Sequence, residues 1–176
     1  MPYPLLRLLL CLPLLTLACE KEPLDTLDEL VPATQEGANT LGCLIDGEVF
    51  YNRGGSLNVQ DIFGSSRSIP NKRISIVGRE ILSDGVANAN SVIVRLTEPV
   101  LGSNSIFDPF DAYVERDNGG HETTYFVNTS MPYNVELSKL DEVDQIISGV
   151  FSFTVCDTIT GDCKLIADGR FDVRYQ

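Results

Sequence analysis

The chain has 176 residues, which is enough for one domain of ordinary size. It carries 25 Asp and Glu residues against 13 Lys and Arg residues, and its net charge is −12. An acidic surface repels the phosphates of nucleic acids and of anionic lipid headgroups, which argues against a nucleic-acid-binding protein. Because the chain has one histidine, a zinc site built from several histidines of the same chain is excluded.

The first segment has the pattern of a secretory signal. Arg7 is the only charged residue before Cys19, and the apolar run that follows it ends at Ala18. This run is too short to cross about 30 Å of hydrocarbon, which takes about 20 helical residues. An uncleaved anchor helix is the alternative that the pattern leaves open. Residues 15–19, Leu-Thr-Leu-Ala-Cys, resemble the lipobox of bacterial lipoproteins.

The lipobox resemblance implies a signal peptide over residues 1–18, cleavage before Cys19, and acylation of the Cys19 thiol and of the new amine. Several acyl chains hold a protein on a membrane far more stably than one chain does. We therefore expect a lipid-anchored protein of the cell envelope, at the outer membrane, with exposure at the cell surface left open. The expected contact with the membrane is made through the lipid.

Residues 19–38 are predicted to form an acidic tether between the lipid and the folded domain. The alternative is one short amphipathic turn between Pro23 and Pro32, where leucines recur among acidic residues. The acidic cluster that follows Cys19 also resembles the surface-export signal of Bacteroidetes-type lipoproteins.

From about residue 39 the apolar residues recur at every second position, which predicts half-buried strands. The clearest stretches are Val92–Leu96, Tyr133–Leu137 and Phe151–Val155. Turn signals lie between them, at residues 117–120, 141–144 and 160–162. We therefore predict a single all-β domain over residues 39–176, an antiparallel β-sandwich or partly open barrel of about eight to ten strands.

The five cysteines have different expected fates. Cys11 leaves with the signal peptide and Cys19 takes the lipid. The inward phase of the preceding aromatic residues turns Cys156 outward, and a hairpin loop brings Cys163 opposite it. We predict a disulfide between these two cysteines, which the oxidising envelope permits. Cys43 is left over, and its apolar neighbours indicate a small buried side chain, with a reactive thiol as the alternative.

The apolar residues after Cys163 change phase. Ile166 stands at an even-numbered position, whereas Phe171, Val173 and Tyr175 stand at odd-numbered positions. Regular alternation would therefore place Ile166 on the opposite face of the strand. A β-bulge at Gly169 would supply the one extra residue that keeps all of them inside. The alternative is that Ile166 packs in a second, smaller cluster.

Two stretches carry a family resemblance. One is Ala38–Cys43 with Asp46–Phe50, and the other is Ile146–Phe153 with Asp168–Asp172. Together they resemble a family of small Bacteroidetes-type envelope lipoproteins that is classed as a domain of unknown function. The resemblance implies an envelope lipoprotein with a β-rich fold, and it implies no activity and no catalytic residues.

The chain shows no catalytic layout. His121 is the only histidine, and it directly follows a predicted turn, where a side chain is usually exposed. No phosphate-binding loop or dinucleotide fingerprint is present. We therefore predict no catalytic residues, no metal and no cofactor.

Acidic residues offer one open alternative. Asp108, Asp111, Glu115 and Asp117 cluster within one stretch, where they could form half of a calcium site or a glycosidase pair, or merely a solvated strand face.

Two short stretches, Asp25-Thr26-Leu27 and Asp157-Thr158-Ile159, resemble the O-glycosylation sequon of Bacteroidetes-type envelope proteins. Thr26 and Thr158 are therefore candidate glycosylation sites.

These features predict a non-enzymatic binding or structural module whose partner is a glycan, a peptide or another protein. Aromatic residues such as Phe107, Phe110, Tyr113 and Tyr125 are candidate contacts, with core packing as their alternative role. The second hypothesis is a carboxylate-dependent polysaccharide hydrolase. The third is a carrier that holds a small apolar ligand inside a barrel.

Overall fold

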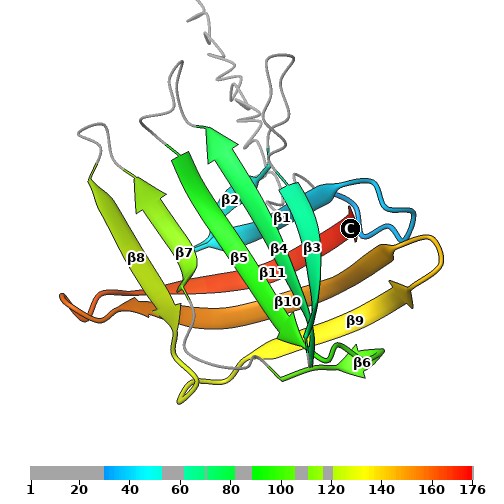
Figure 1. Ribbon diagram of the computed structural model, residues 1–176. Helices are drawn as coiled ribbons and strands as arrows, with labels where there is room; N and C mark the ends of the chain where they lie inside the picture. The colour runs from blue at the N-terminus through cyan, green and yellow to red at the C-terminus, as the bar shows by residue number, and fades with distance from the viewer. Residues whose placement is uncertain are drawn as a thin grey trace, which may run out of the picture.

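The computed structural model describes residues 30–52, 62–69, 71–81, 89–105, 111–116 and 121–175 (Figure 1). Within these ranges the chain forms eleven strands and no helix, which confirms the all-β prediction. Sequence periodicity indicated about eight to ten strands, because it does not detect an element as short as the two-residue β6. The strands are β1 (Thr40–Ile45), β2 (Glu48–Tyr51), β3 (Ile62–Ile69), β4 (Asn71–Ile81), β5 (Ala89–Thr97), β6 (Gly102–Ser103), β7 (Asp111–Arg116), β8 (Glu122–Val127), β9 (Asn134–Asp141), β10 (Ile146–Asp157) and β11 (Cys163–Arg174).

The described strands form one antiparallel sheet that branches at β10. Its main path runs β2-β1-β11-β10-β8-β7-β5-β4-β3. One edge of β10 pairs with β9 over residues 146–152 and with β8 over residues 155–157, whereas the other edge pairs with β11. β6 pairs with the far edge of β9. The two partners of one β10 edge let the sheet divide and bend around its own core.

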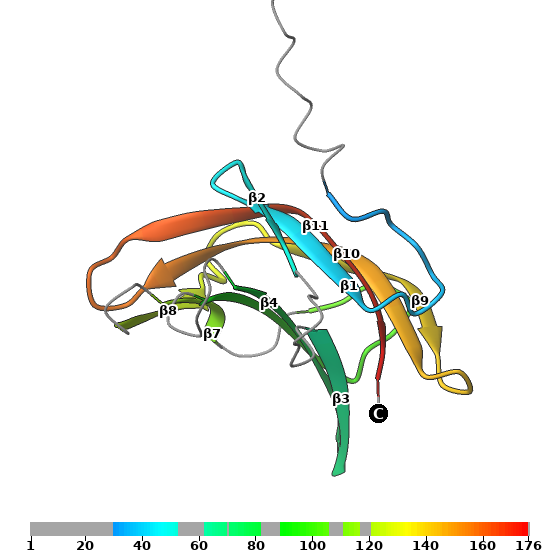
Figure 2. The same ribbon diagram turned by 90° about the horizontal axis from the view of Figure 1, so that it is seen from above.

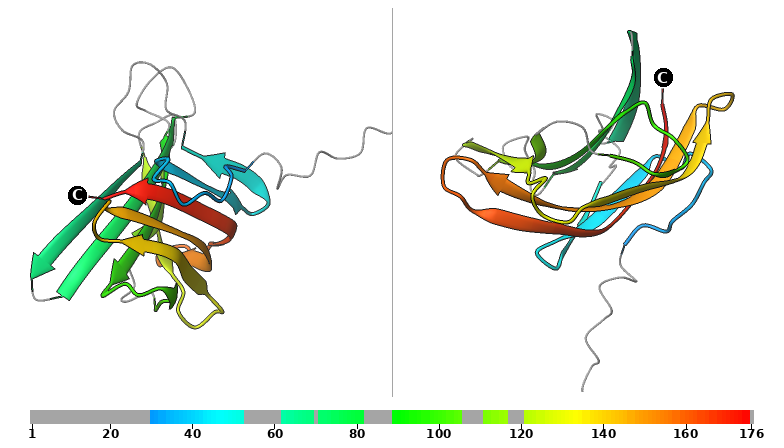
Figure 3. Two further views of the ribbon diagram at one scale, coloured as in Figure 1. Left: turned by 90° about the vertical axis from the view of Figure 1, so that its right-hand side faces the viewer. Right: turned by 90° about the horizontal axis from the view of Figure 1, so that it is seen from below.

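The sheet curls so that its two ends face each other. β3, β4 and β5 cross in front of β10 and β11 (Figure 1), and the views from above and below show the curved back that β10 and β11 form (Figures 2 and 3). β4 packs across from β1 and β2, and β3 packs across from β11. The architecture is therefore a nearly closed, barrel-like sheet, as predicted. Its largest fully buried side chains are Phe50, Phe151, Phe153, Leu41, Ile74, Ile76, Leu96, Ile147, Ile166, Val92, Val94 and Val135.

Period-two alternation correctly predicts which residues of β5 and β10 face the core. The inward residues of both strands are buried, whereas the residues between them are mostly more exposed. Tyr133 is the exception, because 37% of its surface is exposed and β9 begins only at Asn134. Pro132 lacks the amide hydrogen that a strand ladder needs, so the alternation does not extend back to Tyr133. The inward phase of Val135 and Leu137 therefore begins within β9 and does not include Tyr133.

The opposed ends of the sheet meet at a glycine. A Cβ atom added at Gly78 of β4 would lie 2.7 Å from Cδ2 of Leu41 on β1. Real Cβ atoms do not approach so closely, so the absence of a side chain at Gly78 lets Leu41 fill the space between the two layers. A glycine here is therefore a packing requirement.

The predicted bulge is confirmed. The β10–β11 register shifts between Phe151 and Phe153, and the β1–β11 register shifts at the same level of β11. Asp168, directly before Gly169, has a φ of +50°, which marks it as the extra residue of the bulge. Ile166 and Phe171 consequently belong to the same core cluster, and no second cluster is needed.

The segment that leads into β1 is docked on the outer side of the sheet (Figure 2). We call residues 30–39 the strap. Asp172 of β11 is 1% exposed, and its carboxylate accepts hydrogen bonds from the Thr34 hydroxyl, the backbone amides of residues 36–38 and the Ser148 hydroxyl. Arg174 donates to the Glu36 carbonyl at 3.2 Å. Most of the strap lies within the predicted tether, and it is part of the folded surface.

Candidate functional site

A cavity of about 410 Å³ lies at one end of the inner side of the sheet. We call it the mouth cavity, because most of its lining comes from strand ends: the β1–β2 turn, the end of β4, the start of β5 and the start of β11. Tyr113 of β7 completes the described lining. The mouths of β-barrels are common places for ligand sites. Its described lining residues are Ile45, Asp46, Glu48, Val49, Phe50, Glu80, Asn90, Tyr113 and Lys164.

Because side chains alternate between the two faces of β4 and β5, polar side chains of both strands point into the mouth cavity. Ile76 and Gly78 face the core, so Glu80, two residues further on, points the same way. Glu80 pairs across the ladder with Asn90, and 7% of its surface is exposed. The Asn90 Oδ1 atom is shielded from solvent and has no hydrogen-bond partner among the described residues. Because a buried acceptor without a donor costs about 1–3 kcal/mol, this carbonyl is suited to a donor from a ligand.

Tyr113 of β7 and Lys164 of β11 line one side of the cavity, and Tyr125 of β8 packs against Tyr113. The ring centroids of Tyr113 and Tyr125 lie 5.4 Å apart, and both side chains are almost fully buried. The Lys164 ammonium lies 5.4 Å from the centroid of Tyr125 and 6.0 Å from that of Tyr113. The electron-rich ring faces therefore already hold one ammonium group.

The β1–β2 turn fixes the rim of the cavity. Asp46 and Gly47 have φ values of +52° and +87°, as a two-residue hairpin turn with the right-handed strand twist requires. One oxygen of the Asp46 carboxylate accepts a hydrogen bond from the Leu165 amide at 2.8 Å. This bond joins the turn to β11 and holds the Asp46 charge beside the cavity.

Cys43 is buried in the core, opposite Phe50 in the β1–β2 ladder. Burial raises the pKa of its thiol, and the neighbouring Glu80 carboxylate raises that pKa further. Reactive cysteines need the opposite environment, a nearby positive charge. Cys43 therefore has the environment of the small buried side chain that the sequence predicts.

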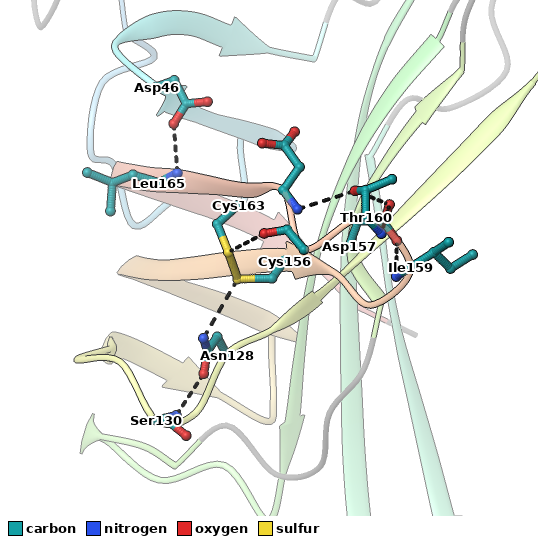
Figure 4. Close-up of a disulfide and its surroundings, with 11 residues drawn as sticks. Asp46, Asn128, Ser130, Cys156, Asp157, Ile159, Thr160, Cys163 and Leu165 are labelled. Carbon is teal, nitrogen blue, oxygen red and sulfur yellow. Dashed lines mark hydrogen bonds between the residues drawn. A yellow bond between two sulfur atoms is a disulfide. The ribbon is translucent and has the colours of Figure 1, made fainter.

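The predicted disulfide between Cys156 and Cys163 is present (Figure 4). The two residues are directly opposite each other in the β10–β11 ladder, with their Cα atoms 4.1 Å apart. Asp157 caps the loop between them by accepting hydrogen bonds from the Thr160 hydroxyl and the Ile159 amide, which hold the pKa of Asp157 below its ordinary value. Thr158, a candidate glycosylation site, is exposed in this loop.

A second hollow, of about 320 Å³, lies beside the β-bulge of β11, and its lining includes Asn134 and Ser152. Its rim contains Asp168, which is exposed, and Arg170, whose guanidinium donates to the Val31 carbonyl of the strap at 3.3 Å. Because the arginine already binds the strap, this hollow offers less to a ligand than the mouth cavity does.

Several residues singled out in the sequence lie outside the described ranges. They are Cys11, Cys19, Thr26, Phe107, Asp108, Phe110 and Asp117. Asp111 and Glu115 lie on β7, but their side chains are also outside what the structure describes. His121 is exposed, as expected for a residue beside a turn. No group of three or more metal-ligating side chains occurs among the described residues.

Of the residues that line the mouth cavity, Tyr113 is predicted from the sequence as a candidate contact, and Asp46–Phe50 belong to a stretch that carries the family resemblance, but no sequence signal predicts that these residues meet at one cavity. A usable signal was present for Glu80, because the spacing of Ile74, Ile76 and Gly78 places Glu80 on the inner face. The pairing of Glu80 with Asn90 also depends on the β4–β5 register, which alternation alone does not determine.

Comparison of the chain with protein-family models, curated proteins and solved structures finds no match. Over the part of the chain that the structure describes, there is no helix with the length and apolar character needed to cross a membrane.

Proposed function

We propose that the protein is a lipid-anchored lipoprotein of the cell envelope whose β domain is a non-enzymatic binding module. The mouth cavity carries the binding part of this proposal. It has the volume of a small-ligand site, and it combines apolar lining with a few polar groups that converge from different strands. The unpartnered Asn90 carbonyl adds a specific reason for a ligand to bind there.

The envelope location is supported by two sequence features and one structural feature. The apolar run and lipobox-like residues before Cys19 support export and acylation. The Cys156–Cys163 disulfide supports an oxidising compartment, because cytosolic proteins rarely keep such bonds. A family of Bacteroidetes-type envelope lipoproteins is the resemblance that fits these features, and the outer membrane is the proposed site of anchoring.

Mass spectrometry of the protein extracted from native membranes tests the anchor. The expected result is a chain that begins at Cys19 and carries acyl groups. Protease treatment of intact cells then distinguishes surface exposure, in which the domain is removed, from a periplasmic location, in which it is protected. A mature chain without lipid would contradict the anchored state.

Ligand binding is tested by thermal unfolding of the full chain with panels of glycans, short peptides and small amines. A ligand that binds only the folded state raises the unfolding temperature in proportion to its occupancy. The Asn90→Leu variant should lose the response, whereas Asn134→Leu, an equivalent change at an exposed position of β9, should keep it. A response that survives Asn90→Leu would place the ligand elsewhere.

Glu48 and Glu80 line the same cavity, and this observation favours a second candidate function, a carboxylate-dependent polysaccharide hydrolase. Such an enzyme releases new reducing ends from a polysaccharide. Loss of this release in both Glu48→Gln and Glu80→Gln would support hydrolysis. Binding without any release of reducing ends supports the binding module.

A further inference from the structure

We propose that the mouth cavity binds an organic amine, meaning a ligand with an alkylammonium group at the end of a short methylene chain. This ligand class presupposes the binding function proposed above and deepens it. Two sources share the chemistry: the side chain of a lysine-containing peptide and a free polyamine.

Hydrogen-bond acceptors dominate the described lining of the mouth cavity. Asp46, Glu48 and Glu80 bring carboxylates, and Asn90 brings its unpartnered carbonyl. Among the described lining residues, Lys164 is the one cationic group. A ligand ammonium supplies three N–H donors and a positive charge, which match this excess of acceptors and of negative charge.

The aromatic side of the cavity already holds a cation. The Tyr113 and Tyr125 rings hold the Lys164 ammonium within 6.0 Å of their centroids. Because this ammonium repels a second cation at the rings, the place for a ligand ammonium is the acidic side of the cavity, at the carboxylates and the Asn90 carbonyl. A carboxylate ligand would meet three like charges there and would have Lys164 as its one cationic partner among the described lining residues.

Burial strengthens the attraction of Glu80 for a cation. With only 7% of its surface exposed, its carboxylate is screened by water and salt less than an exposed acid is. The charge acts on its surroundings, because it contributes to the raised pKa of Cys43. A neutral sugar can donate hydroxyl hydrogen bonds to this carboxylate, whereas an ammonium adds the attraction of opposite charges to its hydrogen bonds.

The remaining lining fits the methylene chain of such a ligand. Ile45, Val49 and Phe50 give the cavity an apolar wall beside its carboxylates. A volume of about 410 Å³ holds a lysine-like side chain and excludes a folded partner. The combination of an apolar wall with acidic groups distinguishes an alkylamine from an inorganic cation, which would need oxygen ligands on all sides.

Isothermal titration calorimetry of the full chain, purified from membranes in detergent, tests the proposal. The probes are acetyl-Ala-Lys-Ala-amide, the same peptide with neutral norleucine in place of lysine, spermidine, and a neutral methyl glucoside. We expect at least one amine to bind about tenfold or more tightly than the norleucine peptide, and its affinity to fall as salt is added. Binding of spermidine alone would assign a free polyamine, and binding of the lysine peptide would assign a peptide side chain.

Variants distinguish the effect of the Glu80 charge on binding from a loss of folding. Glu80→Gln should weaken amine binding about tenfold, whereas Glu136→Gln, the same change at an exposed position of β9, should leave it unchanged. Asn90→Asp keeps the acceptor and adds a negative charge, so it should bind the amine more tightly than the unaltered chain does. This gain cannot arise from a loss of folding.

The outcomes distinguish the ligand class from the binding function. One outcome is that the norleucine peptide or the glucoside binds as tightly as the amines, and that Asn90→Leu abolishes this binding while Glu80→Gln does not. The proposal of an amine ligand is then wrong, and the binding function stands. If no probe binds the unaltered chain, the amine proposal is overturned, and the binding function is overturned as well only when the glycan and peptide panels also leave the unfolding temperature unchanged.

Discussion

Thr34 and Asp172 are 138 residues apart in the sequence, yet the Thr34 hydroxyl donates a hydrogen bond of 2.5 Å to the Asp172 carboxylate. The same carboxylate accepts a hydrogen bond of 2.6 Å from the Ser148 hydroxyl and hydrogen bonds from three successive backbone amides of the strap. One side chain of β11 therefore joins the start of the folded domain to two of its last strands. Its burial is tolerated because these five donors satisfy its two oxygens.

Replacement of Asp172 should release the strap. We expect Asp172→Asn to lower the free energy of unfolding by about 3 kcal/mol, because an amide cannot accept this set of donors and leaves some of them buried without a partner. Urea unfolding followed by circular dichroism measures the change. Asp168→Asn is the matched control on the same strand, and its exposed side chain should give a change within about 0.5 kcal/mol. Equal losses in the two variants would contradict the role of the strap.

The stability of the chain should fall in acid through Asp172. Burial by itself raises the pKa of this carboxyl, but the hydrogen bonds from Ser148, Thr34 and the strap amides outweigh burial and lower it to about 2. Because the folded pKa lies below the unfolded one, the stabilisation is complete above about pH 5 and is lost between about pH 5 and pH 2. It amounts to about 2.5 kcal/mol.

Unfolding free energies measured by urea from pH 7 to pH 3 should therefore decline for the unaltered chain. The decline should be shallower in Asp172→Asn. Asp141 and Asp157, whose pKa values are also lowered, add a smaller change of the same sign in both proteins. The same slope in both proteins would show that other carboxyls cause the acid sensitivity.

The sequence predicts the inner face of this fold better than its outer face. Alternation correctly places Phe151, Phe153 and Phe171 in the core, and the change of phase after Ile166 correctly requires a bulge. These are local signals, since each depends on neighbouring residues of one strand. The same alternation places Asp172 on the outer face but cannot indicate that the strap covers it.

The mouth cavity was harder to predict for a related reason. Glu80 and Asn90 face each other because of the β4–β5 register, and Lys164 reaches the tyrosine rings because β8 and β11 flank β10. The first relationship depends on the register of neighbouring strands, and the second joins residues that are distant in sequence. The chemistry of the cavity therefore follows from the topology, which composition and periodicity do not determine.

The contact between Gly78 and Leu41 gives a test of how the sheet closes. Gly78→Ala should destabilise the protein by about 1–3 kcal/mol, because the new methyl group overlaps the Leu41 side chain. Leu41→Ala alone should cost about 2–5 kcal/mol through the cavity that it leaves. In the double variant the new methyl group partly fills that cavity, so the loss should be smaller than the sum of the two single losses. Additive losses would mean that the two residues do not share this space.

Loss of the disulfide should weaken the β10–β11 hairpin without unfolding the domain. The bond closes a short loop with a sequence separation of 7, for which chain entropy predicts about 2–3 kcal/mol. We expect the double variant Cys156→Ser/Cys163→Ser to show this loss in urea unfolding. The unaltered chain in a strong reductant should unfold at the same urea concentration as the variant. An unchanged midpoint in both cases would show that the hairpin is held by the ladder and by the Asp157 cap alone.

Cys43 should react with thiol reagents only after the protein unfolds. Its side chain has no exposed surface, and burial followed by the charge of Glu80 raises its pKa, so the reactive thiolate is scarce at neutral pH. Labelling with N-ethylmaleimide at pH 7.5, followed by mass spectrometry of the peptide that contains Cys43, should find no adduct in the native chain. The same peptide should label fully in guanidinium, which provides the control for access to the thiol. Rapid labelling of the native chain would mean that the core around Cys43 opens to solvent while the rest of the domain stays folded.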